Sequence, residues 1–191
     1  MDRRRFLTAL TSTTALPLAG CSLPTDAKSM PSATTYHDPD AGDYVYEYGP
    51  GDTQWAQYAV EFARSGGPDD PVDVTLVVTG SDRLATTDLR FVVEPAPNVV
   101  GTVPEVRYLA KSWPPVTVSG EGRRTVLDVG GIDDPVDATL HFDLTVDPVG
   151  EGMEQVFVVA EGSFTSGEPS PFGRYRLRES EVYDLPAPRS A

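Results

Sequence analysis

The chain has 191 residues, which is enough for one domain, or two small ones, with a real hydrophobic core. Its 29 acidic residues outnumber 15 basic ones, and the formal net charge is −14. An overall charge of this sign repels nucleic acid and anionic lipid, so it argues against both as partners.

The first 21 residues have the layout of an export signal: a basic start, a short apolar stretch and small residues before a cleavage point. The arginine pair ahead of Phe-Leu resembles a twin-arginine signal, formed here by Arg3, Arg4, Phe6 and Leu7. The stretch Leu18-Ala19-Gly20-Cys21 resembles a lipobox. The resemblance to lipoproteins implies cleavage before Cys21 and attachment of a lipid to its thiol.

Two other interpretations of this segment stay open, a transmembrane helix and a secreted protein in which Cys21 is incidental. A membrane span needs about 20 mostly apolar residues, whereas the run from Phe6 to Gly20 is interrupted by Thr, Ser and Pro17. Cys21 is the single cysteine, so no disulfide forms within the chain and the thiol is available to a lipid. We therefore expect an extracellular protein, lipid-anchored at the outer face of the cytoplasmic membrane.

The kind of charge is also informative. Among the 15 basic residues the only lysines are Lys28 and Lys111. Acidic surfaces with few lysines resemble the proteome bias of salt-loving archaea, and the resemblance implies a halophilic protein. In molar salt the Debye length is about 3 Å, so the acidic side chains no longer repel one another strongly. We expect the domain to loosen when salt is withdrawn.

Residues 22–43 contain Pro, Ser and Thr patches and almost no large apolar residue, which predicts a flexible tether. Beyond it, apolar and polar residues alternate with the period of half-buried strands, and Gly and Pro turns separate the segments. A disordered tail is expected at 186–191. Strands are expected at 56–62, 72–79, 89–93, 106–111, 123–129, 138–146, 155–161 and 173–183, with Tyr44, Tyr46 and Tyr48 forming an additional edge strand.

The segment 66–76 recurs at 130–140 with changes only at its third and ninth positions, and weaker echoes follow in the same order. This repetition predicts a duplicated four-strand unit, with pseudo-repeats at about 54–113 and 122–183. Eight or nine closely spaced strands favour one all-β domain over 44–185, an immunoglobulin-like β-sandwich. Two tandem small sandwiches are the alternative, although each would bury little core. The Cys-Trp-Cys signature of antibody domains is absent, so the prediction concerns architecture alone.

The repeated segment carries Asp-Asp-Pro-Val-Asp, the strongest candidate for chemistry. Calcium takes six to eight oxygen ligands, and the two loops offer the carboxylates of Asp69, Asp70, Asp73, Asp133, Asp134 and Asp137. The simpler interpretation is a duplicated turn, in which Asp bonds backbone amides and Pro extends the residue before it. We expect the turn, without a cofactor, and keep Ca²⁺ binding as the alternative. The tyrosines near residue 46 present a similar choice between an aromatic binding strip and edge-strand packing.

Catalysis has little support in the sequence. No serine-nucleophile, phosphate-loop or zinc-protease motif occurs, and neither His37 nor His141 adjoins one. We expect a non-enzymatic binding or structural module at the cell surface, whose partner is another envelope protein or a glycan and not nucleic acid. The alternatives are a cation- or solute-binding lipoprotein that uses the Asp loops and, further off, a carboxylate-dependent hydrolase.

Overall fold

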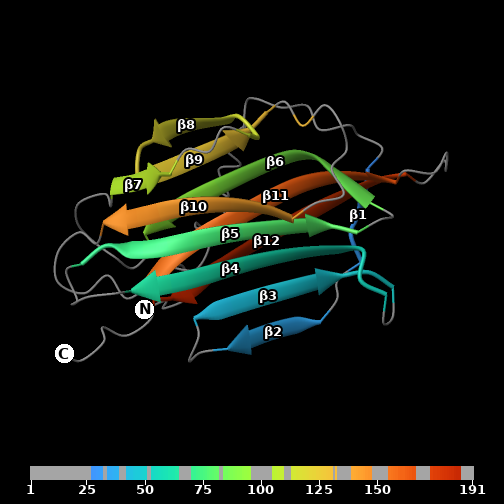
Figure 1. The fold of residues 1–191 in the computed structure, drawn as a ribbon, viewed down its shortest axis with the longest axis horizontal. Coiled ribbons are helices and arrows are strands. Elements are labelled where there is room, and N and C mark those ends of the chain that lie inside the picture. The colour runs from blue at the N-terminus through green and yellow to red at the C-terminus, as the bar shows by residue number, and fades with distance from the viewer. Residues whose placement is uncertain are drawn as a thin grey trace, which may run out of the picture.

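The computed structural model describes residues 27–31, 34–38, 42–50, 53–64, 70–81, 84–95, 105–109, 113–130, 132, 139–147, 155–166 and 173–185. Within them the chain forms twelve strands in two six-stranded sheets. Sheet A has the order β1 (Lys28–Ser29), β12 (Arg174–Asp184), β11 (Gln155–Ser166), β6 (Leu84–Pro95), β9 (Arg124–Val129), β8 (Val116–Glu121). Sheet B has the order β2 (Thr35–Asp38), β3 (Asp43–Tyr48), β4 (Ala56–Arg64), β5 (Val72–Gly80), β10 (Thr139–Asp147), β7 (Glu105–Tyr108). Figure 1 shows β7, β8 and β9 along the top and β2 and β3 along the bottom.

The two sheets pack face to face around one core, so the predicted all-β sandwich is confirmed. Along β5 and β10 the apolar residues are buried and most of the polar residues between them are not, because successive side chains of a strand point to opposite faces. Phe91 of sheet A lies 5.1 Å from Phe142 and 6.4 Å from Tyr58 between ring centroids, and all three side chains are fully buried. The core cluster draws on both expected repeats, which favours one sandwich over two small ones.

The predicted number of strands, eight or nine, is too low, because β1, β2 and β8 were not expected. β1 and β2 are short and polar, so no apolar period marks them. Backbone pairing with β12 and with β3 determines their positions, and that pairing does not depend on apolar side chains. β8 follows two prolines and contains a glycine, which together conceal its short Val-Thr-Val alternation.

The folded domain begins earlier than the expected boundary at residue 44. Met30, inside the segment expected to be a tether, is 8% exposed and belongs to the core cluster. Its backbone N–H donates a hydrogen bond of 2.7 Å to the carbonyl of Arg176. One methionine among Pro and Ser residues gives no periodic signal, so the sequence pattern could not reveal this contact.

Three expected segments lie outside the described residues in whole or in part: the signal 1–21, the start of the tether at 22–26 and the tail 186–191. In the part of the chain that is described, no helix is long and apolar enough to cross a membrane.

The strands expected to be duplicates are neighbours in two of the four cases. β5 pairs antiparallel with β10, and β6 pairs antiparallel with β11. The remaining pairs are divided between the sheets, because β4 and β7 lie in sheet B while β9 and β12 lie in sheet A. The two halves of the chain are therefore not arranged as equivalent four-strand units, and the duplication stays a prediction from the sequence.

Candidate functional site

Asp70 and Asp73 are the predicted calcium ligands that the structure describes. Both are exposed at the start of β5. No group of three or more His, Cys, Asp or Glu side chains that could hold a metal ion occurs within the described ranges. The other predicted site residues lie outside those ranges: Asp69, Asp133, Asp134, Asp137, Cys21, Arg3, Arg4, Phe6 and Leu7.

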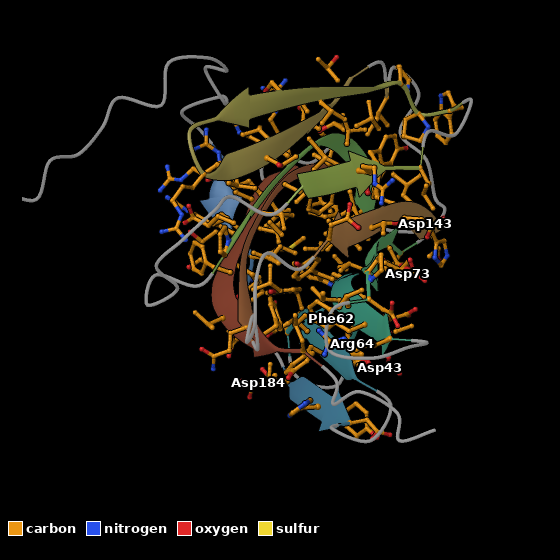
Figure 2. All side chains as sticks on the ribbon, turned by 90° about the vertical axis from the view of Figure 1, so that its left-hand side faces the viewer. Asp43, Phe62, Arg64, Asp73, Asp143 and Asp184 are labelled. Carbon is orange, nitrogen blue, oxygen red and sulfur yellow. The ribbon has the colours of Figure 1, made fainter. Side chains whose placement is uncertain are left out.

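Asp73 takes part in a reciprocal pair of hydrogen bonds on the outer side of sheet B, where Figure 2 shows both Asp73 and Asp143. Thr145 donates from Oγ1 to Asp73 over 3.3 Å. Thr75 donates in the same way to Asp143 over 3.1 Å. Each donor lies directly opposite its acceptor in the β5–β10 register. Cross-strand pairs of this kind stabilise sheet pairing, which gives Asp73 a structural role.

The strands that follow the two Asp loops begin at opposite ends of sheet B. Val72, the first residue of β5, pairs with Val146, whereas Thr139, the first residue of β10, pairs with Thr79. The strand between these positions is about 24 Å long at the usual rise per residue. Antiparallel pairing therefore places the starts of β5 and β10 far apart.

A cluster of tyrosine and glutamate side chains joins the sheets at the β3–β12 edge. Tyr46 donates a hydrogen bond from its hydroxyl to Glu181, and Tyr48 donates one of 2.5 Å to Glu179. Both tyrosines are buried, at 7% and 4% exposure, so their expected packing against the sandwich is confirmed. The expected edge position is wrong, because β3 lies between β2 and β4. We call these four residues the Tyr–Glu clamp. It connects a strand of sheet B to a strand of sheet A.

Two more tyrosines extend the clamp into the core. Tyr58 and Tyr183 are fully buried, and neither hydroxyl makes a hydrogen bond of regular geometry. Burial is the main cause that raises the pKa of Tyr46, Tyr48, Tyr58 and Tyr183, because a phenolate cannot be solvated there. The neighbouring Glu181 raises the pKa of Tyr46 further, and Glu179 does the same for Tyr48. All four hydroxyls therefore remain protonated at neutral pH, and those of Tyr46 and Tyr48 act as donors.

Arg64, the last residue of β4, is a buried cation. It is 8% exposed, and its Nε and Nη2 atoms have no hydrogen-bond partner among the described residues. Figure 2 shows Arg64 between the two sheets with Phe62. Burying a guanidinium whose donors are not all hydrogen-bonded is costly to the folded state. The structure offers no catalytic arrangement for it, and we treat it as a weak point of the sandwich.

The exposed apolar side chains gather at the opposite edge of the sandwich. Leu109 follows β7 and is 53% exposed, while Trp113 precedes β8 and is 47% exposed. Val118, within β8, is 44% exposed. We call these three residues the apolar edge. Of the five large hydrophobic side chains found exposed in the described chain, these three lie on or next to the edge strands β7 and β8.

The backbone of β8 makes this edge accessible to another strand. β8 pairs with β9 on one side and ends the sheet on the other. Val116 and Val118 lie opposite Val129 and Leu127, two core residues, so their side chains face the core side. Val116 is partly buried, whereas Val118 lies largely uncovered. A strip of core-facing surface is thus left open along β8.

The other three edges carry features that discourage strand addition. β1 has two residues, and β2 ends in an aspartate. β7 has four residues and carries an ion pair of 2.8 Å from Arg107 to Asp147. β8 has no charged residue before Glu121. Short length and charge protect an edge strand from pairing, so β8 is the least protected edge of the sandwich.

The sequence pattern does not predict the apolar edge, because the two prolines ahead of β8 indicate a turn and not a strand. The available signal was Trp113 ahead of an alternating Val-Thr-Val run. That pattern indicates a strand, but only the strand order in the sheet shows that this strand is unpaired.

Two solved structures are similar to the chain. One is an uncharacterised protein from Nocardia farcinica with an immunoglobulin-like fold, at 14% identity and a TM-score of 0.41, covering 66% of this chain and 96% of that one. The other is the GAE domain of GGA2p from Saccharomyces cerevisiae, at 10% identity and a TM-score of 0.35, covering 72% and 95%.

None of the curated proteins compared with the sequence is significantly similar to it. A family model described as a domain of unknown function, DUF8121, matches residues 28–187. This match begins at the first strand and covers most of the chain, so the protein belongs to the DUF8121 family.

Proposed function

We propose that this protein is a non-enzymatic, lipid-anchored binding module that holds an extended segment of another envelope protein along β8. The observation that carries the proposal is the apolar edge, in which Leu109, Trp113 and Val118 are exposed at or near β8, a strand whose outer side has no partner strand among the described residues and which has no charged residue before Glu121. Exposed apolar clusters on acidic, soluble domains mark interaction surfaces.

The chemistry of such an edge favours strand addition over binding of a small ligand. A strand that joins a sheet edge gains main-chain hydrogen bonds, and pockets for every second side chain provide specificity. Along β8 the uncovered strip beside Val118 is where those alternate side chains would lie. We expect a partner segment with apolar residues at every second position and no charge on that face.

We further propose that a twin-arginine signal exports the chain and that a lipid on Cys21 holds it at the outer face of the cytoplasmic membrane. The arginine pair and the lipobox support this. The acidic, lysine-poor composition supports a halophilic surface. We keep the immunoglobulin-like type of sandwich as part of the same proposal.

The strand order supports different roles for the two edges of sheet A, one joined to the lipid anchor and the other binding the partner. β1, the strand nearest in sequence to Cys21, is at one edge and β8 is at the other. Five strand spacings separate them, about 24 Å. A lipid attached ahead of β1 would thus join the domain to the membrane from the edge of sheet A opposite the apolar edge.

The test is co-purification from solubilised membranes in high salt, comparing the natural chain with Trp113→Ser and Val118→Arg. We expect a stoichiometric protein companion that both substitutions remove. Tyr36→Ser is the matched control, because Tyr36 is an aromatic residue of 59% exposure on β2, at the edge opposite β7 in sheet B. A companion that survives both edge substitutions, or is lost equally with the control, would overturn the proposal.

A further inference from the structure

Three arginines form a row on the outer face of β12. Arg174, Arg176 and Arg178 alternate with Tyr175 and Leu177, which belong to the core or pack against it. Arg174 and Arg178 are exposed and Arg176 is half-buried. Such a row is unusual in a chain whose net charge is −14. The charge of this protein is therefore unevenly distributed, and its overall sign does not describe every surface.

The strand beside the row leaves its two exposed arginines accessible. Arg174 lies opposite Thr165 of β11, which carries no charge. Arg178 makes an ion pair of 3.3 Å with Glu161, yet its side chain remains 68% exposed. Exposed pairs of this kind are weak and exchange partners readily. The exposed side chains of Arg174 and Arg178 are thus accessible to an anionic surface.

The chain enters the fold directly beside this row. β1 runs parallel to β12, with Lys28 paired to Tyr175 and Ser29 to Arg176. Met30 follows in the core, so this attachment is firm. Lys28 lies seven positions after Cys21, and a fully extended chain of that length spans at most about 25 Å. A lipid on Cys21 would therefore keep the β1–β12 edge close to the bilayer.

Sheet B presents the opposite charge at the same edge of the sandwich. Asp43, Glu47 and Glu61 lie on β3 and β4, and the side chains of Glu47 and Glu61 are exposed. An anionic leaflet attracts the arginines and repels these carboxylates. The two effects act together, because both turn the β12 side of this edge toward the lipid, and β8 lies at the far edge of sheet A.

We propose that the arginine row docks the domain on anionic lipid headgroups of the membrane that holds Cys21. This inference rests on the lipid anchor proposed above and adds an orientation to it: β12 against the bilayer and β8 away from it. The lipid anchor holds the domain near the bilayer, and the arginines determine which side of the domain contacts the headgroups. Near an anionic surface each arginine changes the docking equilibrium about fivefold at physiological salt, and less at higher salt.

The test places a dye on the lipidated protein in vesicles that contain a nitroxide-labelled headgroup lipid. Because Cys21 is the single cysteine and would carry the lipid, Ser180→Cys provides one free thiol beside the row. Ser119→Cys on β8 is the matched control. Vesicles are phosphatidylcholine alone or mixed with phosphatidylglycerol, at the lowest salt at which circular dichroism shows the native fold.

We expect strong quenching at position 180 and little at position 119 in the anionic vesicles, and weak quenching at both positions in the neutral ones. Arg174→Gln with Arg178→Gln, two exposed sites that should not disturb folding, should abolish the difference. Replacing the same two arginines with lysine should preserve it. Quenching that ignores lipid charge, or that survives the glutamine pair, would overturn the docking.

Failure of the anchor is seen separately, by the mass of the N-terminal peptide. If Cys21 carries no lipid, co-sedimentation of the full chain with the same vesicles still tests whether the arginine row binds anionic lipid. Sedimentation with anionic vesicles that the glutamine pair abolishes would support the row, and absence of any sedimentation would overturn it.

Discussion

Tyr48 in sheet B donates a hydrogen bond of 2.5 Å to Glu179 in sheet A, across the sandwich and 131 positions along the chain. Together with the bond from Tyr46 to Glu181 it connects β3 to β12. Glutamates on an inward face need donors, and the tyrosines on the opposing strand provide them. The clamp therefore stabilises the edge of the sandwich where the chain enters the fold.

Tyr48→Phe should destabilise the protein, because it leaves the carboxylate of Glu179 without its donor. A hydrogen bond to a charged group contributes about 1.5–3 kcal/mol, and we expect a loss in the free energy of unfolding of that size in denaturant titrations. Tyr36→Phe, at an exposed position, should change it little. Equal effects of the two substitutions would show that the clamp does not stabilise the edge.

Stability should fall in alkali. The pKa of Tyr46, Tyr48, Tyr58 and Tyr183 lies above the ordinary value of 10.0 in the folded state. Groups with a raised folded pKa contribute stability that is complete below the unfolded value and is lost as the pH rises above it. Unfolding free energies measured across pH 8 to 12, roughly two units on either side of that value, should therefore decline beyond about pH 10.

Tyr58→Phe removes one of these buried groups and should make the decline less steep. The comparison uses the slope of unfolding free energy against pH, so a general loss of stability in the variant does not obscure the result. A slope that Tyr58→Phe leaves unchanged would count against burial as the cause.

Arg64→Met should stabilise the protein. The substitution keeps a flexible, apolar stem and removes a guanidinium whose Nε and Nη2 have no partner. Replacing buried charge by a hydrophobic side chain is often stabilising by about 1–4 kcal/mol, and molar salt screens the attraction to distant carboxylates. Arg107→Met, at a side chain of 54% exposure, is the control and should have little effect. A lower melting temperature for Arg64→Met would reveal a partner for the buried charge.

Met30→Ala tests where the folded domain begins. Met30 is 8% exposed in the core cluster, and truncation of a buried methionine typically costs about 2–5 kcal/mol. The neighbouring Ser29→Ala, at an exposed position, should cost almost nothing. If neither substitution changes the free energy of unfolding in denaturant titrations, residues 28–31 do not contribute to the stability of the folded domain.

The sequence predicts the parts of the fold in which side-chain alternation and burial coincide. β4, β5 and β10 alternate clearly, and the core residues Val60, Leu76 and Phe142 follow from that pattern. The residue pattern of β12 does not show which of its faces is buried, because glutamates occupy the inward face and arginines the outer one. Apolar periodicity cannot reveal a polar contact between sheets, so the Tyr–Glu clamp had no signal that sequence alone could supply.

The pairing of strands is a second feature that the sequence pattern does not predict. The repeated segment identifies the two Asp loops in the sequence. Only the antiparallel register of β5 and β10 shows that the strands after these loops start at opposite ends of sheet B. In the same way, Trp113 and Val118 can be recognised as apolar in the sequence, whereas their exposure depends on β8 having no neighbour beyond it. Both features depend on pairing across the chain, which local patterns do not encode.

The most direct test of the binding proposal is site-specific photo-crosslinking in intact membranes. A photoreactive amino acid at position 118, on the apolar edge, is compared with one at position 36, on β2 of sheet B. The account predicts one discrete protein adduct from position 118 and none from position 36. Absence of an adduct at 118, or the same adducts at both positions, would contradict the assignment of β8 as the binding edge.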